Sequence, residues 1–389
     1  VIVAGCRTPI GTIGGQFKTL APVELTIPVM QNLIKRSGID PVIIDDVIWG
    51  CNYQRTYKEN NLARVAAVKA GLPVTVPGIT IHRNCTSSMS AIQMGFYQIR
   101  AGEAECIMAG GSDSMSTAPH MVFNARYGQK YGHMEMRDSM WDSLTNLGVG
   151  PAMGITAENV ADKYGITREQ MDAYSLRSQQ RAVAAIDAGR FEEEIIPVTV
   201  KTRKSETTYT VDEYPKRNAT LEGLQKLKPA FKEGGKVTAG NASGMNDASS
   251  GVILMSEEKA KELGCPIIAK VVSVATTGVE PELMGIGPIS STKKALEKAG
   301  LTVDDIDLFE INEAFSSQCL ACQQELGVPD DKLNVNGGGI SLGHPVGATG
   351  SRIVITLMYE LKRRKQRYGV ATLCAGGGMG TTVIIEMMQ

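Results

Sequence analysis

Short apolar runs alternate along the chain with longer segments in which apolar side chains recur at helical spacing. Runs of this kind, bounded by turn residues, predict short buried strands. They lie at 1–4, 79–81, 106–109 and 370–373. The segments 29–37 and 292–299 predict helices, because each stops at a glycine, Gly38 or Gly300. Strands that alternate with helices predict a layered α/β fold.

The pattern after the first predicted helix recurs after the second. Each is followed by an Asp-containing turn and an apolar strand. Cys85 then comes 47 residues after Gly38, and His344 comes 44 residues after Gly300. We expect both Cys85 and His344 to stand at the start of a helix, and a strand closing on glycines follows each. The chain is therefore predicted to contain two similar halves that face one another.

Residues 115–245 interrupt this repeat with aromatic, methionine and charged residues. Charge runs at 192–194 and 201–204 are predicted to be solvated faces. The stretch 216–236 holds six basic residues against two acidic ones. A phosphate-bearing ligand and a solvated loop explain that excess equally well.

Composition narrows the possible functions. With 389 residues the chain exceeds the size of one hydrophobic core. Its formal charge of -1 gives no global attraction to nucleic acid or to an anionic membrane surface. No apolar run reaches the roughly 20 residues that span a bilayer, so we expect a soluble, cytoplasmic protein that binds no nucleic acid and no membrane.

Eight cysteines in a chain of this length are too sparse for a disulfide framework, and we expect free thiols in a reducing compartment. Cys319 and Cys322 form a lone CxxC without a second ligand pair, so we expect no metal site. Small apolar filling on a helix is the predicted role of this pair.

Cys85 follows the strand at 79–81 and precedes a hydroxyl-rich turn and a helical pattern. Backbone N–H groups at a helix start favour a thiolate and can hold an oxyanion. A buried structural cysteine is the alternative, but a hydroxyl-rich turn at a strand-to-helix junction is poor core. Cys85 is therefore a candidate nucleophile.

His344 is one of four histidines and lies in the glycine-rich segment 337–350, where backbone can approach a ligand closely. A phosphate-cradling loop is the competing interpretation, but the segment lacks the Gly-Lys-Ser/Thr ending of a P-loop. An imidazole here suits proton transfer or oxyanion donation. Cys374 ends the strand at 370–373 before a run of glycines. Asn312 begins a predicted helix after an apolar strand, and taken alone it could be no more than a helix cap.

Four motifs, in this order, resemble the thiolase family over essentially the whole chain: Cys85, NEAF at 312–315, GHP at 343–345 and CAGGGMG at 374–380. Further segments are similar to thiolases at 7–11, 153–159 and 239–244. The resemblance implies a five-layer α/β/α/β/α sandwich of two duplicated halves with an inserted loop domain. It places the N-terminal half at 1–114 plus 246–267, the loop domain at 115–245 and the C-terminal half at 268–389.

The same resemblance implies an acyltransferase that condenses two acetyl-CoA reversibly to acetoacetyl-CoA and CoA by a ping-pong mechanism. Cys85 would carry the acyl group, His344 would activate it, and Cys374 would move the α-proton. Asn312 would position a water in one oxyanion hole, and the Cys85 and Gly376 amides would form the other. No metal or redox cofactor is needed. The implied contacts of the CoA substrate are Lys216, Ser243, Met153, Met284 and Phe315.

The chain departs from the family pattern at His82, Ser88 and Ala152, where thiolases usually have Asn, Gly and His. These departures can alter CoA affinity or acyl preference.

The segment 138–144 resembles short-chain thiolases. This favours an acetoacetyl-CoA thiolase over a broader-chain 3-ketoacyl-CoA thiolase of fatty-acid β-oxidation. A condensing enzyme that acts on carrier-protein substrates fits less well, because the active sites typical of those enzymes lack a second catalytic cysteine. A non-catalytic acyl-CoA-binding module is the alternative from another class. The resemblance also implies a homodimer or a homotetramer built through the insert around 118–140.

Overall fold

The structure is a computed structural model that describes residues 1–55 and 57–388. Five strands form the N-terminal half of the sheet, in the order β4-β3-β5-β10-β1. Their bounds are β1 (Ile2–Arg7), β3 (Asp46–Gly50), β4 (Gly78–Ile81), β5 (Cys106–Ser114) and β10 (Asn246–Met255), with the short β2 (Gly11–Thr12) paired to β10. β3 runs parallel to β4 and β5, whereas β10 is antiparallel to β5 and β1.

The C-terminal half repeats this arrangement in the order β12-β13-β14-β11. The bounds are β11 (Ala269–Gly278), β12 (Leu308–Ile311), β13 (Tyr368–Ala375) and β14 (Met379–Met387). β12 is parallel to β13, and β14 is antiparallel to both β13 and β11. A parallel bridge from Phe309 to Leu333 stands where β4 stands in the first half. The predicted internal repeat is confirmed, and the halves meet at the pair Ile2–Ala269.

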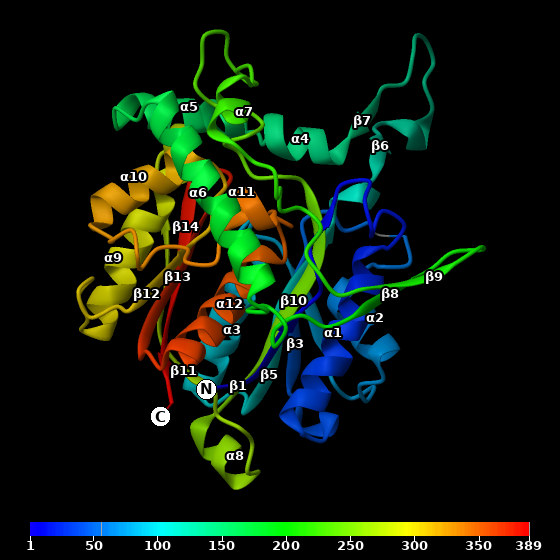
Figure 1. Cartoon of the computed structure of the whole chain (residues 1–389). Coiled ribbons are helices and arrows are strands. Elements are labelled where there is room, and N and C mark those ends of the chain that lie inside the picture. Colours follow the sequence, from blue (N-terminus) through cyan, green and yellow to red (C-terminus); the bar gives the residue numbers. More distant parts are fainter. Residues whose placement is uncertain (56, 389) are drawn as a thin grey trace.

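Helices form three layers around these strands (Figure 1). α1 (Pro22–Ser37) and α2 (Leu62–Ala70) cover the outer face of the first half, and α9 (Gly287–Ala299) and α10 (Ser316–Leu326) cover that of the second. Between the halves lie α3 (Ser87–Ala101) and α12 (Thr349–Arg364), each in contact with both. Each interface has its own apolar core. The expected five-layer sandwich is therefore confirmed.

The two central helices approach each other closely. A Cβ at Gly350 of α12 would lie 2.5 Å from the backbone nitrogen of Met89 on α3, so this crossing requires glycine. Ser88 Oγ accepts a hydrogen bond of 2.9 Å from the Ser351 N–H across the same crossing. Ser88, one of the departures from the family pattern, thus lies where α3 and α12 cross. These two helices follow the segments that contain Cys85 and His344.

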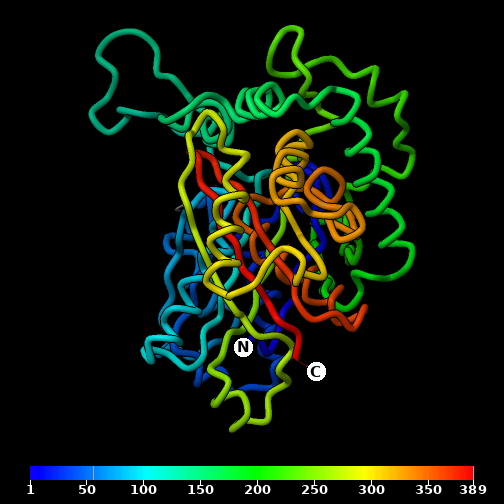
Figure 2. The backbone as a smooth tube through the Cα atoms, turned by 90° about the vertical axis from the view of Figure 1, so that its left-hand side faces the viewer, coloured from blue at the N-terminus to red at the C-terminus, as the bar shows by residue number. Residues whose placement is uncertain are grey.

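The remaining elements lie mainly between β5 and β10 and above the strand ends (Figures 1 and 2). They are β6 (His120–Val122), β7 (Met136–Asp138), α4 (Ser139–Thr145), α5 (Met153–Lys163), α6 (Arg168–Asp187), β8 (Val198–Lys201), β9 (Glu206–Tyr209) and α7 (Leu221–Gln225). Outside this region lie α8 (Glu257–Glu262) and α11 (Gly339–Leu342). Short 3₁₀ turns are η1 (Pro41–Ile43), η2 (Met115–Thr117), η3 (Ala125–Tyr127) and η4 (Pro281–Ile286). The β6–β7 hairpin projects from the body as an arm (Figure 2).

Most local predictions agree with these elements. The predicted strands coincide with parts of β1, β4, β5 and β13, and the predicted helices with the C-terminal parts of α1 and α9. Cys319 and Cys322 are buried on α10, as expected. Among the described residues, none of the helices has the length and apolar character needed to cross a bilayer.

The prediction that the acidic run at 192–194 is solvated is wrong for Glu194. Its side chain is 1% exposed and accepts a hydrogen bond of 2.6 Å from Arg7 Nε. Arg7 also binds both carboxylate oxygens of Asp212, at 2.7 and 2.9 Å. A buried arginine needs such partners, and it draws two distant carboxylates inward, which a charge run alone cannot reveal.

Candidate active site

Cys85 lies in the connection from β4 to α3, two residues before the helix begins at Ser87. The backbone before it is sharply turned, since Asn84 has a φ of 46°. The half-buried thiol faces its own backbone N–H and that of Gly376. Cys85 and Gly376 are therefore together as predicted, with two amides directed at one sulfur.

The resting state of Cys85 differs from the prediction. Burial raises the pKa of the thiol to about 11, although the Gly376 and Cys85 amides oppose this. The nearby carboxylate of Asp113 raises it further. At pH 7 such a group is a thiolate in roughly one molecule in 10⁴. Desolvation outweighs the helix start, so Cys85 needs a base.

His344 is buried in the connection between α11 and α12. Its Nε2 lies 3.5 Å from Asn312 Nδ2, and its backbone N–H donates to Asn246 Oδ1 at 2.9 Å. The prediction that a helix starts at His344 is wrong, because α12 begins five residues later at Thr349. Gly343, with a φ of 105°, turns the chain sharply against Asn246. This glycine serves close packing within the protein.

The hydrogen bonds of Thr349 define the tautomer of His344. Thr349 Oγ1 donates to the Pro345 carbonyl at 2.9 Å and lies 2.7 Å from His344 Nδ1. Since the hydroxyl has one proton, its oxygen accepts from Nδ1–H, and the lone pair of Nε2 faces the Asn312 side-chain N–H. Burial lowers the pKa of His344 to about 3, and the charge of Arg352 lowers it further. The imidazole is neutral and can accept a proton at Nε2.

Replacing Thr349 by valine should lower kcat by about tenfold, the size expected when a positioned acid–base group loses part of its effect. Valine has the same shape but cannot accept the Nδ1–H, so both tautomers become populated. Thr349→Ser should restore kcat. Steady-state kinetics with KM measured separately will test this, and ¹⁵N NMR of the imidazole will report the tautomer. Equal kcat in the valine and serine variants would refute the assignment.

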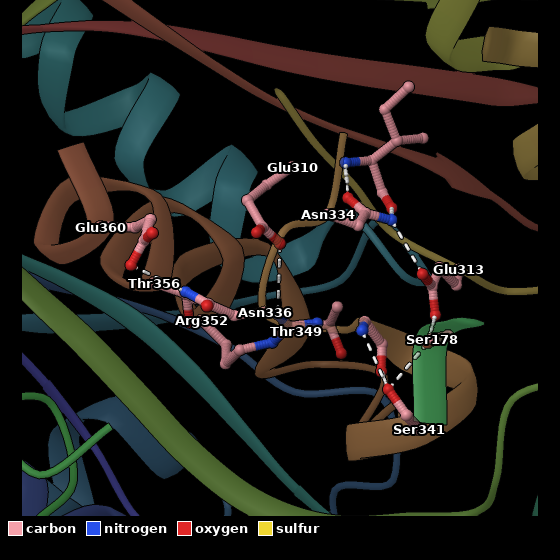
Figure 3. A network of polar contacts seen from close by, with 12 residues as sticks. Ser178, Glu310, Glu313, Asn334, Asn336, Ser341, Thr349, Arg352, Thr356 and Glu360 are labelled. Carbon is pink, nitrogen blue, oxygen red and sulfur yellow. Dashed lines mark hydrogen bonds and ion pairs between the residues drawn. The ribbon is translucent and has the colours of Figure 1, made fainter. Parts of the chain in front are cut away.

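Arg352 lies one turn after Thr349 on α12 (Figure 3). Its buried guanidinium is 3.7 Å from Glu310 Oε2, and none of its three nitrogens has a hydrogen-bond partner in the described part of the chain. Burial raises the pKa of Glu310 to about 8, opposed by the charge of Arg352. The positive charge of Arg352 also disfavours protonation of the neutral His344 ring.

Asn312 follows β12, and its buried Oδ1 has no hydrogen-bond partner among residues 1–55 and 57–388. The helix predicted to begin at Asn312 begins at Ser316, so Asn312 is not a helix cap. Its N–H instead continues the strand pairing, donating to the Thr372 carbonyl at 3.0 Å. The side-chain amide of Asn312 therefore lies beside His344, and its Oδ1 is available to accept a hydrogen bond.

Glu313 holds this segment in place (Figure 3). Its carboxylate accepts hydrogen bonds from Ser178 Oγ at 2.6 Å, Asn334 Nδ2 at 3.0 Å and the Ile340 N–H at 3.1 Å. These partners come from α6, the chain after α10, and α11. Glu313 thus ties Asn312 to the segment that leads to His344.

Cys374 lies near the end of β13, as predicted, and is buried in an apolar cluster with Met284 and Phe315, against which Met153 packs. Burial raises the pKa of its thiol well above the usual value, and the neighbouring Cys85 raises it further. The segments of the two cysteines meet through Asn84, next to Cys85, which donates to the carbonyl of Gly376, two residues after Cys374. Three predicted acyl-channel residues share the surroundings of the Cys374 sulfur.

The departure at His82 has a definite place in the site. His82 Nε2 donates to Asn84 Oδ1 at 2.9 Å, and Asn84 Nδ2 donates to the Gly376 carbonyl at 2.7 Å. Gly376 begins a glycine turn in which Gly377 and Gly378 have positive φ. Asn84 therefore restrains a flexible turn whose first amide faces Cys85. Ala152, the third departure, is the N-cap of α5 and offers no capping side chain.

Four of the five predicted CoA contacts lie near Cys374 or near one another: Met153, Met284 and Phe315 share its apolar cluster, and Ser243 adjoins Phe315. The Ser243 N–H donates to the Ala314 carbonyl at 2.9 Å, which places Ser243 beside Phe315. Lys216 Nζ lies 5.7 Å from the ring centre of Tyr214, which packs against Gly244. Of the six basic residues at 216–236, three form ion pairs with carboxylates: Arg217 with Asp187, and Lys232 and Lys236 with Asp162.

Sequence reasoning missed five residues that shape the site. Thr349 and Asn246 hold His344, Asp113 binds the Gly347 N–H at 2.5 Å, and Phe231 packs edge-on against Phe315. The fifth residue, Tyr53, packs in the same small cluster as Cys85. Thr349 carries a local signal, since it lies in the glycine-rich segment with His344. The other four lie far from their partners in sequence.

Comparison with known proteins supports this geometry. Residues 1–258 match the family model of the thiolase N-terminal domain, and residues 265–387 match that of the thiolase C-terminal domain. An acetyl-CoA acetyltransferase of Syntrophomonas wolfei subsp. wolfei is 49% identical, covering 100% of this chain and 99% of that protein. One from Pseudomonas aeruginosa is 47% identical, covering 99% and 98%.

Two solved structures are similar over the full chain. The crystal structure of the Bacillus anthracis acetyl-CoA acetyltransferase has a TM-score of 0.98 and 48% identity, covering 100% of this chain and 98% of that one. Human mitochondrial 3-ketoacyl-CoA thiolase in complex with CoA has a TM-score of 0.96 and 42% identity, covering 100% and 97%. With both family models matched across nearly all of its length, this chain belongs to the thiolase family.

Proposed function

We propose that this chain is an acetyl-CoA C-acetyltransferase that condenses two acetyl-CoA reversibly to acetoacetyl-CoA and CoA. The observation that carries the proposal is that the segments of the predicted groups converge. Asn84, next to Cys85, donates to the carbonyl of Gly376, two residues after Cys374, and Cys85 packs with Val346, two residues after His344. Relatives with 45–49% identity carry the name acetyl-CoA acetyltransferase. Two thiols and one base suit a reaction with one acyl transfer and one proton abstraction.

In the first half-reaction, His344 Nε2 accepts the proton of Cys85 as the sulfur attacks the thioester carbonyl of acetyl-CoA. The backbone N–H groups of Cys85 and Gly376 stabilise the oxyanion. When the tetrahedral intermediate collapses, the CoA sulfur leaves and takes the proton from His344. The product is S-acetyl-Cys85 and free CoA.

In the second half-reaction, Cys374 first passes its thiol proton to Nε2 of His344, and the resulting thiolate removes a proton from C2 of a second acetyl-CoA. The enolate oxygen is stabilised by Nε2–H of His344 and by a water held at Asn312, whose Oδ1 is a free acceptor. The enolate carbon attacks the acetyl carbonyl, and the Cys85 sulfur leaves. The Cys85 sulfur takes the proton from Nε2 of His344, Cys374 keeps the proton from C2, and acetoacetyl-CoA is released.

We place the CoA substrate along Ser243 and Lys216, with Met153, Met284 and Phe315 lining the acyl channel beside Cys374. A CoA complex of a relative with 42% identity supports CoA thioesters as ligands. The proposed boundaries remain 1–114 plus 246–267 for the first half, 115–245 for the loop domain and 268–389 for the second half. The chemistry requires no metal or redox cofactor. Eight free cysteines support a reducing compartment such as the cytoplasm, and we place the reaction in lipid metabolism there.

A second copy of the chain is the proposed partner, in a homodimer or homotetramer. The arm at 120–141 exposes several large apolar side chains, and proteins rarely leave so many of them together in contact with solvent. They are Met121, Val122, Phe123, Tyr127, Tyr131, Met134, Met136 and Trp141. Light scattering after gel filtration should give two or four chains per particle.

Mass spectrometry after mixing with acetyl-CoA tests the proposal directly. The expected result is one acetyl group on Cys85 and none in Cys85→Ala, because Cys85 is partly exposed beside the start of α3, whereas Cys374 is buried. Cys322→Ala, which removes another buried thiol, should acetylate normally. Absence of the adduct in the unaltered protein would favour a non-catalytic acyl-CoA-binding module.

A 3-ketoacyl-CoA thiolase of broader chain length is the second candidate. Human mitochondrial 3-ketoacyl-CoA thiolase supports it, with a TM-score of 0.97 and 43% identity. Thiolysis rates for acetoacetyl-CoA and for a C8 3-ketoacyl-CoA distinguish the two. Equal or faster turnover of the C8 substrate would replace the acetyl-specific proposal.

A further inference from the structure

Two separate apolar clusters border the paired thiols. The first surrounds Cys374 and contains the acyl-channel residues already described. The second, which we name the Cys85 cluster, consists of Tyr53, Met115 and Val346, with Cys85, Ala118 and Met140 packed against it. None of these apolar neighbours has a role in the proton transfers. The cluster is drawn from four segments, after β3, after β5, before α12 and on α4.

Tyr53 is fixed at both ends within this cluster. Its side chain is 4% exposed, and its backbone N–H donates to Asp113 Oδ1 at 2.9 Å. Its hydroxyl lies 2.8 Å from Ser143 Oγ on α4. Ser143 Oγ donates to the Met140 carbonyl at 2.8 Å, so the Tyr53 hydroxyl is the donor to Ser143. The ring cannot swing aside without losing a buried hydrogen bond.

Asp113 makes this anchor firm. Its buried carboxylate also accepts hydrogen bonds from the Asn52 N–H at 2.9 Å and from the Gly347 N–H. The chain after β3 is therefore bound to the segment between His344 and α12. Tyr53 is positioned by the same carboxylate that holds the loop of the catalytic histidine.

The geometry of a thioester on Cys85 determines where its alkyl group lies. The carbonyl carbon is trigonal, so sulfur, oxygen and the alkyl carbon share a plane, and the attacking carbon approaches from outside that plane. With the oxygen held at the Gly376 N–H, the alkyl carbon points away from Gly376. Cys374 and its cluster occupy the route of the second substrate. The alkyl group is left with the Cys85 cluster.

We propose that Tyr53, backed by Met115 and Met140, closes the acyl site and restricts the group carried by Cys85 to two carbons. This inference rests on the proposed transfer through Cys85 and adds the residue that determines chain length. Each methylene that cannot be accommodated is worth roughly 10-fold or more in discrimination. The ring of Tyr53 supplies such a limit because it is buried and packed with Met115 and Val346.

The test compares thiolysis of acetoacetyl-CoA and 3-ketooctanoyl-CoA in the intact enzyme and in Tyr53→Ala. We expect the unaltered enzyme to prefer the short substrate by at least about tenfold in kcat/KM, and Tyr53→Ala to shift the ratio toward the long substrate by at least about tenfold. The matched control is Tyr53→Phe, which keeps the ring. Its ratio should stay within about twofold of the original, whatever its absolute activity.

Competition labelling separates this inference from the function on which it rests. Equal amounts of acetyl-CoA and octanoyl-CoA are mixed with each variant, and the two adducts on Cys85 are counted by mass spectrometry. No adduct on the unaltered enzyme would defeat the proposed function itself. Normal acetylation with an unchanged adduct ratio in Tyr53→Ala would overturn only the role of Tyr53.

A second variant guards against misfolding of Tyr53→Ala. Met140 is half-buried on the short helix α4, so Met140→Ala removes part of the cover with less disturbance of the core. It should shift the ratio in the same direction by a smaller factor. If the unaltered enzyme already uses the long substrate equally well, or if neither variant shifts the ratio, Tyr53 does not limit the acyl group.

Discussion

Replacement of His344 by alanine should lower kcat/KM for thiolysis of acetoacetyl-CoA by about 10³- to 10⁴-fold, the upper range for a general base. The reason is that the Cys85 thiol is protonated before the reaction begins. Burial raises the pKa of Cys85 to about 11, so hardly any thiolate exists at neutral pH without help. Nε2 of a neutral His344 is the acceptor that removes this limit.

The pH dependence makes the prediction specific. Burial lowers the pKa of His344 to about 3, so the imidazole stays neutral, with Nε2 unprotonated, throughout pH 6 to 9. Acetylation of Cys85 should therefore be nearly independent of pH in the unaltered enzyme over that range. In His344→Ala only the thiolate reacts, and the rate should rise about tenfold per pH unit up to the pKa of Cys85.

Rapid quenching followed by mass spectrometry of the Cys85 adduct measures these rates. Thermal unfolding should first show that His344→Ala is folded. A flat profile in the alanine variant would mean that another group deprotonates Cys85, and the role given to His344 would then be incorrect.

Replacement of Cys374 by alanine should separate the two half-reactions. Acetylation of Cys85 from acetyl-CoA needs no proton removal from carbon, so the adduct should form at a similar rate. Condensation should fall by about 10³-fold or more, because alanine cannot take the C2 proton. Burial and the nearby Cys85 keep the Cys374 pKa well above its usual value, which suits a base for a weak carbon acid.

Deuterium exchange at C2 of acetyl-CoA in heavy water reports this step alone. Exchange should be lost in Cys374→Ala while exchange of labelled CoA into acetyl-CoA continues. The control is Cys322→Ala, since that buried thiol lies on α10 without a role in the reaction. Continued C2 exchange without Cys374 would assign the proton removal to another group.

Local signals in the sequence were enough to predict the strands and the two halves, and the resemblance to thiolases then selected Cys85, His344 and Cys374 as the candidate reacting side chains. Buried strands such as β5 and β13 are short apolar runs that end in glycines. Cys85, His344 and Cys374 stand beside glycine or hydroxyl turns at element ends, where side chains are free for chemistry. These features depend on near neighbours in the chain, so they can be seen without the fold.

The tertiary structure decided the properties that arise between distant segments. It buries Cys85 and so reverses the expected ease of forming a thiolate, and it pairs Glu194 with Arg7 across the molecule. It also starts α12 at Thr349, which gives His344 a partner in place of a helix end. Burial and charge are set by which segments pack together, and desolvation outweighs a local backbone preference. The sequence by itself therefore determined which side chains are candidates for the reaction, and only the folded chain determined their neighbours, their burial and the direction in which their pKa values shift.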